Sequence, residues 1–195
     1  MKNIGTQTIE TKRLILRRVK PEDAEDMFCW TGDDEVTKYM TWKSHPDIEA
    51  TKNYINYILS KLEKDDCYDW IIEYKETGKA IGSIGVSALD ANFEKAEVGY
   101  CLSKKYWRKG IMTEALSAVM QYLFDKCCFN RVEAHHHVDN PASGRVMLKC
   151  GMKFEGIMRQ WRKDNQGRFC DTAEYAALNK DRVQSEKCKV QRETD

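Results

Sequence analysis

A short basic turn that contains a glycine could bind a phosphate. Four basic residues fall within six positions, at Lys104, Lys105, Arg108 and Lys109, and Gly110 follows directly. A strand pattern precedes this turn and an amphipathic helix pattern follows it. The N–H groups and positive end of a helix attract anions, and glycine permits close backbone approach. The alternative is a solvated connection, because lysine-rich loops are common on protein surfaces.

A second group of residues, near 140–151, could supply a proton donor. Asn140 suits a helix N-cap, Pro141 suits the first helical position, and Gly151 suits the residue that closes the helix. Ser143 and Met147 then share a face one turn apart, because four residues advance about 400°. A serine hydroxyl carries a transferable proton and a thioether does not. In the alternative, Ser143 only makes a local hydrogen bond in the first helical turn.

Other binding motifs fit this sequence less well. The chain lacks the G-x-x-x-x-G-K-[ST] pattern of a P-loop, and GSIG at 82–85 lies inside a strand pattern instead of opening a helix. His135, His136 and His137 alternate along a predicted strand, which puts the first and third on one face. No H-x-x-x-H or C-x-x-C pattern accompanies them. We therefore expect no metal.

The composition is that of a globular protein. The chain has 195 residues, of which 42% are hydrophobic and 32% are charged, and its formal net charge is +1. The eight cysteines show no C-x-x-C spacing and no apolar run is long enough to span a membrane, so we expect a reduced, cytoplasmic protein. One domain is predicted over 1–180, followed by a polar tail over 181–195 that begins at Asp181.

Hydrophobic periodicity predicts a single mixed α/β unit. Strands are predicted at 12–19, 68–75, 80–89, 96–102, 131–138, 154–163 and 169–178. Helices are predicted after Pro21 and over 49–64, 110–127 and 141–150. The phosphate-type turn thus lies between a strand and a helix, and the Ser143 segment follows a strand.

Together these segments resemble the GCN5-related N-acetyltransferase (GNAT) superfamily, in the branch of ribosomal-protein N-acetyltransferases. That branch tends to read G-Y-x-L…W-G-x-G-x-x-T/S-E-A, and this chain reads GYCL at 99–102 and WRKGIMTEA at 107–115. Arg108 replaces a glycine and Met112 a small residue, so we expect a slightly altered loop path. The resemblance extends over about 11–178.

The resemblance implies the GNAT fold, an α/β architecture with a twisted, mixed, mostly antiparallel sheet flanked by helices. Two central parallel strands, here 96–102 and 131–137, are expected to splay apart. The co-substrate implied is acetyl-CoA, with its diphosphate on the basic turn and its pantetheine arm in the gap. The residues implied to bind it are Tyr100, Cys101, Leu102, Trp107, Arg108, Lys109, Gly110, Ile111, Met112, Thr113, Asn140 and Ser143.

The activity implied is direct transfer of an acetyl group to a primary amine. Many members carry, at the position of Met147, a tyrosine that protonates the departing thiolate, and the resemblance gives this role here to Ser143. Glu97 is the first candidate for the general base, and a salt-bridged strand glutamate is the alternative. Further candidates are Glu155, Asp139, His135 and His137. Arg162 stands where one member of the branch uses a glutamate, and it cannot accept a proton.

The acceptor is left open between a protein N-terminus, a small amine, an aminoglycoside-like antibiotic and an amino-acid derivative. Four aromatic residues fall in the segment that usually caps the acceptor cleft, namely Trp30, Tyr39, Trp42 and Tyr54. The alternative function is a catalytically weak acyl-CoA-binding or sensor module. A nucleic-acid partner is disfavoured because the basic residues cluster at one turn. No membrane partner is expected, and a homodimer is left open.

Overall fold

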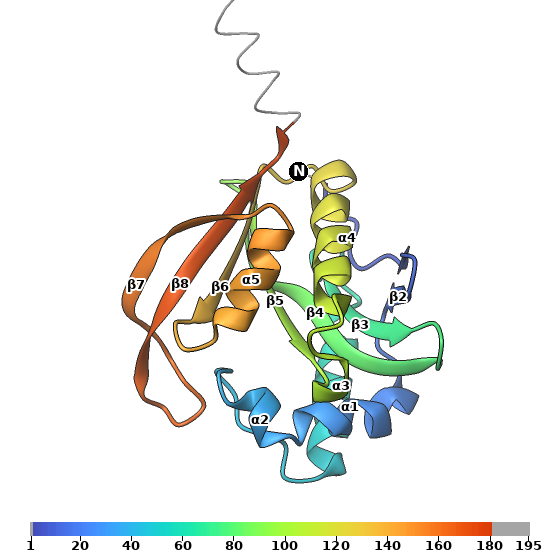
Figure 1. The fold of residues 1–195 in the computed structure, drawn as a ribbon. Coiled ribbons are helices and arrows are strands. Elements are labelled where there is room, and N and C mark those ends of the chain that lie inside the picture. The colour runs from blue at the N-terminus through green and yellow to red at the C-terminus, as the bar shows by residue number, and fades with distance from the viewer. Residues whose placement is uncertain (1, 181–195) are drawn as a thin grey trace, which may run out of the picture.

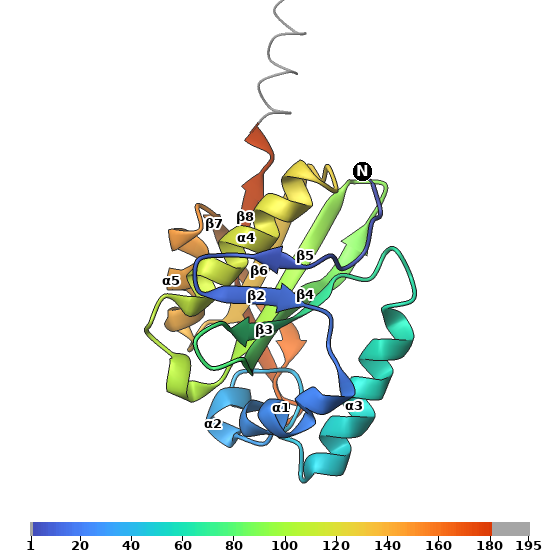
Figure 2. The same ribbon diagram turned by 90° about the vertical axis from the view of Figure 1, so that its right-hand side faces the viewer.

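The computed structural model describes residues 2–180, which form an eight-stranded sheet with helices on both faces (Figures 1 and 2). The strand order is β1-β2-β3-β4-β5-β6-β8-β7. The strands are β1 (Ile9–Glu10), β2 (Leu14–Arg17), β3 (Asp69–Tyr74), β4 (Lys79–Asp90), β5 (Lys95–Leu102), β6 (Arg131–His137), β7 (Lys153–Lys163) and β8 (Phe169–Leu178). The polar tail predicted over 181–195 lies outside the described residues.

Five α-helices and two short 3-10 turns connect the described strands. They are η1 (Pro21–Asp23), α1 (Ala24–Thr31), α2 (Asp34–Thr37), α3 (Ile48–Lys61), η2 (Lys104–Tyr106), α4 (Ile111–Asp125) and α5 (Pro141–Lys149). Every predicted strand and helix is present, with ends that move by a few residues. The helix predicted after Pro21 begins as η1. β1 and α2 were not predicted, because two and four residues are too short to show a hydrophobic period.

Each face of the sheet has its own hydrophobic core. Helix α4 buries Leu116, Val119 and Leu123 completely against one face, where α5 adds Met147. Helices α1 and α3 cover the other face, with Trp30, Ile55 and Ile58 among the buried side chains. Because strand side chains alternate between faces, neighbouring residues of β5 and β6 point into different layers.

The two central parallel strands splay apart, as the resemblance implied. β5 and β6 pair only through Lys95↔Arg131, Ala96↔Val132 and Glu97↔Glu133. All other pairings in the sheet are antiparallel. The segment 98–102 therefore lacks a strand partner on the β6 side, whereas its other side stays paired with β4. This gap lies beside the N-terminal ends of α4 and α5 (Figure 1).

Candidate active site

The turn before α4 presents a continuous row of unpaired backbone donors. Among the described residues, no acceptor bonds the six N–H groups from Arg108 to Thr113. Gly110 has φ 72° and Arg108 has φ 59°, both left-handed. Arg108 thus adopts the conformation that glycine adopts without strain, so the loop keeps a glycine-like path despite the substitution. Such a row of free N–H groups suits the oxygens of a phosphate.

Contacts with the start of β2 hold this turn in place. The Glu114 carboxylate accepts hydrogen bonds from the Thr11 hydroxyl (2.6 Å), the Arg13 amide (2.8 Å) and the Arg13 Nε (2.7 Å). Burial acts to raise the pKa of Glu114, but these hydrogen bonds outweigh it and lower that pKa. Arg13 also donates to the Lys109 carbonyl at 2.9 Å. The glutamate of the T/S-E-A motif therefore has a positioning role.

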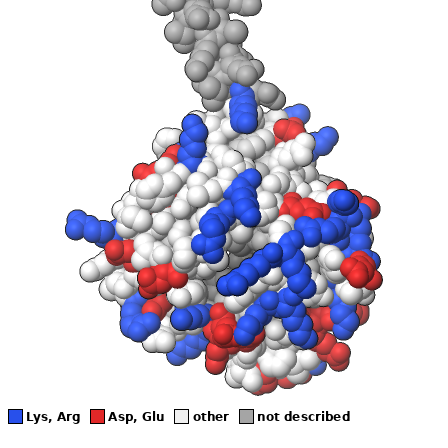
Figure 3. Space-filling model, viewed as in Figure 1, with Lys and Arg blue, Asp and Glu red and all other residues white. Residues whose placement is uncertain are grey.

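The basic side chains predicted at this turn divide into two kinds. Lys104 forms an ion pair with Glu35 of α2, so part of its charge is offset. Lys105, Arg108 and Lys109 are exposed, and Lys and Arg side chains gather on the face that carries α4 and α5 (Figure 3). These three cations can attract a polyanion, and the backbone N–H groups supply the geometry.

Every second backbone N–H group of strand β5 faces the gap. The Ser103 N–H donates to the Ile81 carbonyl on β4 at 2.8 Å. Hydrogen-bonded and free residues alternate along an antiparallel edge, so the N–H groups of Tyr100 and Leu102 face the gap. The same alternation turns the Cys101 N–H toward β4, so Cys101 presents no amide donor there.

Trp107 closes one end of this gap. Its indole Nε1 donates to the Leu102 carbonyl at 2.7 Å, which satisfies the last outward-facing oxygen of β5. The Trp107 ring remains 41% exposed and borders the turn. The tryptophan of the family motif therefore joins the strand end to the phosphate-type turn.

Ser143 and Tyr100 meet across the gap. The Tyr100 Oη and Ser143 Oγ lie 2.8 Å apart, and Tyr100 also donates to the Ser143 carbonyl at 3.2 Å. Burial raises the pKa of Tyr100 well above its ordinary value, although the bond to Ser143 lowers it, so the phenol stays protonated at neutral pH. The sequence placed both residues at the site but did not predict this bond. Together they form a pair of hydroxyl donors.

Helix α5 positions Ser143. Pro141 and Gly151 occupy the predicted helix ends, with Gly151 at φ 84°. Asn140 is the N-cap residue, but its side chain makes no capping hydrogen bond, contrary to the prediction. It borders the cavity instead. Met147 is 1% exposed and packs in the core, so it contributes no polar group one turn beyond Ser143.

A cavity of about 400 Å³ runs from this hydroxyl pair to the opposite face of the sheet. Tyr100, Ser143 and Asn140 border it on the α5 side. The remaining wall comes from α1, α3, the 39–42 segment, β3 to β6 and the β7–β8 hairpin, and includes the predicted aromatic residues Trp30, Tyr39, Trp42 and Tyr54. The cavity thus passes through the sheet where β5 and β6 separate.

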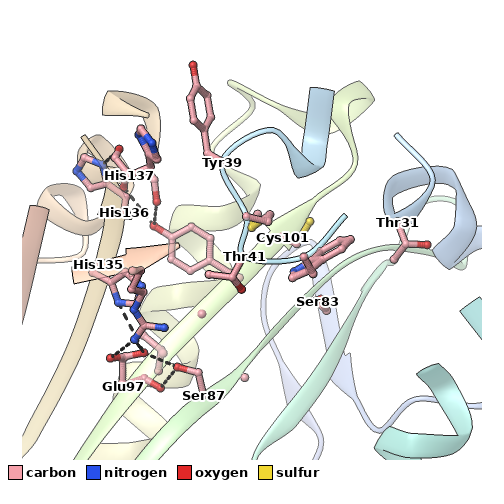
Figure 4. Close-up of a pocket in the computed structure, with 18 of the residues that line it drawn as sticks. Thr31, Tyr39, Thr41, Ser83, Ser87, Glu97, Cys101, His135, His136 and His137 are labelled. Carbon is pink, nitrogen blue, oxygen red and sulfur yellow. Dashed lines mark hydrogen bonds and ion pairs between the residues drawn. The ribbon is translucent and has the colours of Figure 1, made fainter. Parts of the chain in front are cut away.

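Glu97 lies on β5 beside the splay, as predicted, and borders this cavity, but other side chains already bind its carboxylate. The Arg162 Nη2 bonds both carboxylate oxygens at 2.8 and 3.0 Å, and the Ser87 hydroxyl donates at 2.7 Å (Figure 4). The His135 Nδ1 lies 3.6 Å away, too far for a hydrogen bond. Burial acts to raise the pKa of Glu97, but His135, Ser87 and Arg162 outweigh it and hold that pKa at about 2. A carboxylate of such low proton affinity is a poor base.

The other proposed bases differ in their positions. His135 and His137 were predicted from strand alternation to share a face, and both border the cavity, as His136 also does. His137 accepts a hydrogen bond from the Asp139 N–H at 3.1 Å, and its ring lies tilted against the Tyr39 ring, with 5.3 Å between the ring centroids. Asp139 and Glu155 do not line the cavity. The Glu155 carboxylate is paired with Arg131.

Comparison with known proteins agrees with this geometry. Residues 13–153 match the family model described as "Acetyltransferase (GNAT) domain". YoaA of Bacillus subtilis (strain 168), an uncharacterized N-acetyltransferase, is 36% identical over 170 residues, which are 87% of this chain and 96% of YoaA. The ribosomal-protein-serine acetyltransferase of Escherichia coli (strain K12) is 31% identical over 80 residues, 41% of this chain and 45% of that protein.

A solved structure of similar fold is a GNAT-family acetyltransferase from Bacillus anthracis. It has a TM-score of 0.78 and 25% sequence identity, and covers 89% of this chain and 99% of its own. The chain therefore belongs to the GNAT acetyltransferase family, whose members take the acetyl group from acetyl-CoA. The branch resemblance is confirmed as well, because ribosomal-protein acetyltransferases are among its relatives. Among residues 2–180, no helix is long and apolar enough to cross a membrane.

Proposed function

We propose that this chain transfers the acetyl group of acetyl-CoA directly to a primary amine in the cavity at the β5–β6 splay. The Tyr100–Ser143 hydrogen bond of 2.8 Å, at the end of a gap that begins beside six free N–H groups, is the observation that carries the proposal. Family membership supports acetyl-CoA as the donor.

Acetyl-CoA, the acetyl donor, fits backbone N–H groups that have no other partner among the described residues. The N–H groups of 108–113 would hold the diphosphate, and the exposed basic side chains beside them would attract the phosphates. The gap-facing N–H groups of Tyr100 and Leu102 would bind the pantetheine arm and polarise the thioester carbonyl. Of the three β5 residues predicted to bind acetyl-CoA, Cys101 is the one whose N–H turns away from the gap. The side-chain amide of Asn140 borders the cavity and makes no capping hydrogen bond.

The chain's own groups then move the protons. Acetyl-CoA supplies a thioester, whose carbonyl carbon an amine lone pair can attack. In this proposal Tyr100 directs its one hydroxyl proton at Ser143 Oγ, the shorter of its two contacts with Ser143, and the serine proton is then free to point at the leaving sulfur. As the C–S bond breaks and the C–N bond forms, Ser143 protonates the thiolate. This role is consistent with Met147 standing where many members have a tyrosine.

A screen of primary amines tests the proposed activity. The panel contains phenylalaninamide, spermidine, an aminoglycoside and a peptide with a free N-terminus, and mass spectrometry detects the products. We expect at least one acetylated amine and one free thiol released per amide formed. Binding of acetyl-CoA in calorimetry without acetylation of any amine would contradict transferase function and would support the alternative of an acyl-CoA sensor.

A further inference from the structure

A second carboxylate faces the cavity, and it has no partner. Asp69 begins β3 and borders the cavity, yet no hydrogen bond or ion pair from the residues 2–180 reaches its carboxylate oxygens. We propose that Asp69 binds the ammonium group of the acceptor and takes its proton before attack. This inference rests on the proposed amine acetylation and supplies the general base that the sequence left undecided.

The sheet register brings Asp69 close to the splay. Asp69 pairs with Gly85 on β4, and Gly85 pairs with Gly99 on β5. Directly opposite residues point to the same face of a sheet, so these three positions form one row across it. Neither glycine has a side chain, and the cavity floor between Asp69 and β5 is therefore bare backbone.

The Asp69 carboxylate occupies the space above Gly85. A Cβ built on Gly85 would lie 3.1 Å from the Asp69 Oδ1, whereas a Cβ built on Gly99 would meet nothing within 4 Å. Strands lie about 4.8 Å apart, so the empty space above Gly99 is roughly 5 Å from this carboxylate. An amine above Gly99 would then be within reach of Asp69, directly or through one water.

Gly99 also adjoins the gap into which the thioester is expected to reach. Pairing between β5 and β6 ends at Glu97, two residues earlier, and the Tyr100 N–H that follows faces the gap. An amine above Gly99 would therefore have the thioester carbonyl on one side and Asp69 on the other. No side chain of this row lies between Asp69 and the gap, since the β4 and β5 positions are glycines, and a Cβ on Gly99 would meet nothing within 4 Å.

The charges around Asp69 suit a proton acceptor at neutral pH. Burial raises the pKa of Asp69 to about 7, and the Lys61 charge on α3 lowers it. The Tyr54 hydroxyl of α3, the Cys67 thiol before β3 and the Cys101 thiol of β5 also interact with this region; burial raises the pKa of each, so they stay neutral. Tyr57 of α3 borders the cavity too, and the Lys61 Nζ lies 4.2 Å from its ring centroid. Asp69 is thus the anion and Lys61 the cation at this end.

The wall around this row indicates the class of acceptor. Trp30 of α1 and Tyr54 and Tyr57 of α3 also line this cavity, and aromatic faces attract cations. A primary ammonium fits between these rings and a carboxylate. An acceptor that carries its own carboxylate beside the amine would be repelled by Asp69. We therefore assign as acceptors amines that carry no carboxylate beside the amino group, such as a peptide N-terminus, and we exclude free α-amino acids.

The proton balance of the step is complete. The acceptor ammonium gives one proton to Asp69, which passes it to solvent after turnover. The freed lone pair forms the C–N bond, and the nitrogen loses its second proton to solvent as the tetrahedral intermediate collapses. After it has protonated the thiolate, Ser143 regains one proton from solvent. The C–S bond breaks with its electron pair on sulfur, and the thiolate takes a proton through Ser143. One proton is released per amide.

The test compares Asp69→Asn with Asp66→Asn, a substitution of an exposed aspartate three positions earlier. Acetylation of phenylalaninamide, and of any other panel amine that the wild type accepts, is followed by thiol release from pH 5.5 to 9. We expect the wild-type kcat/KM to rise with a midpoint near pH 7, and Asp69→Asn to lose about 10²–10⁴-fold at pH 7. Asp66→Asn should match the wild type, and both variants should bind acetyl-CoA normally in calorimetry.

The outcomes separate this inference from the proposed function. A wild type that acetylates no amine overturns both. A wild type that acetylates amines while Asp69→Asn keeps the same rate and pH profile overturns the role of Asp69 alone. Acetylation of phenylalanine as fast as phenylalaninamide overturns the assigned acceptor class, because we expect a preference of about tenfold or more for the amide.

Discussion

At the residue scale, the carboxylates of Glu97 and Asp69 border the same cavity but differ strongly in pKa. His135, Ser87 and Arg162 outweigh the effect of burial and keep the pKa of Glu97 at about 2, whereas burial without a partner raises the pKa of Asp69 to about 7. A general base works best when its pKa is near the working pH. The environment therefore favours Asp69 over Glu97 as the base, although sequence position alone favoured Glu97.

The same difference predicts a pH-dependent stability. Asp69 has an ordinary pKa of 3.8, which would apply in the unfolded chain, and a pKa of about 7 when folded. The folded state holds the extra proton between these values, so this stabilising contribution is full below pH 4 and is lost as the pH rises through 7. Asp69→Asn should therefore raise the free energy of unfolding at pH 8 by a few kcal/mol at most, since one unit of pKa difference is about 1.4 kcal/mol.

Denaturant unfolding at pH 4.5 and pH 8 measures this effect. Asp69→Asn should gain stability relative to the wild type at pH 8 and little at pH 4.5, and the exposed control Asp66→Asn should show neither change. A substitution that stabilises the fold and slows catalysis is typical of a functional site. Equal or lower stability of Asp69→Asn at pH 8 would show that the folded protein does not raise the pKa of this group.

At the element scale, the turn before α4 depends on its backbone conformation. A Cβ on Gly110 would meet only the Arg13 Nη2, at 3.6 Å, so a side chain there would not clash. The cost comes from φ 72°, which is unfavourable for an L-residue by about 1–2 kcal/mol and more for a β-branched one. Gly110→Val should therefore shift the turn, disperse the N–H groups of 108–113 and abolish acetyl-CoA binding.

Gly78→Val is the matched control for this change. Gly78 has φ 67° in the β3–β4 turn and also has open space around it. Both variants should lose similar stability, and only Gly110→Val should lose acetyl-CoA binding in calorimetry. Normal acetyl-CoA binding by a folded Gly110→Val protein would show that the diphosphate does not bind at this turn.

The bare row across β3, β4 and β5 leads to a separate prediction. Nothing lies within 4 Å of a Cβ on Gly99, so Gly99→Ala should fold as well as the wild type. Its methyl group would occupy the space that we assign to the acceptor amine. We expect a KM for phenylalaninamide raised about tenfold or more, with acetyl-CoA binding unchanged. Unaltered kinetics in Gly99→Ala would place the amine elsewhere.

Sequence patterns were sufficient to predict the long helices and strands but not the contacts between segments that are distant in the chain. Hydrophobic periods of 2.0 and 3.6 predicted the long strands and helices, and the GYCL and WRKGIMTEA motifs indicated the gap and the turn. Asp69 was missed because its proximity to Gly99, thirty positions later in the chain, depends on the pairing of three strands. An acidic residue at the head of the apolar run DWIIEY was the only signal, and it is a weak one.

At the scale of the whole molecule, the proposed reaction would be divided between the two faces of the sheet. α4 and α5 cover the face that carries the free N–H groups and Ser143, where we propose that the donor binds (Figures 1 and 2). α1 and α3 cover the face to which we assign the acceptor. The splay of β5 and β6 joins the two sides. The homodimer that the sequence left open can be tested by equilibrium sedimentation against the 22.7 kDa chain mass. We also propose that 1–180 form one domain, since a single sheet links the described residues.

The central claim is that the pair of hydroxyls at this splay serves acetyl transfer. Kinetics and acetyl-CoA calorimetry of Ser143→Ala test it most directly, because they separate donor binding from turnover. We predict a Kd for acetyl-CoA within a few-fold of the wild type and a kcat lower by about 10²–10⁴-fold, as for loss of a positioned proton donor. Full turnover by Ser143→Ala, or loss of acetyl-CoA binding in step with the rate, would contradict this account.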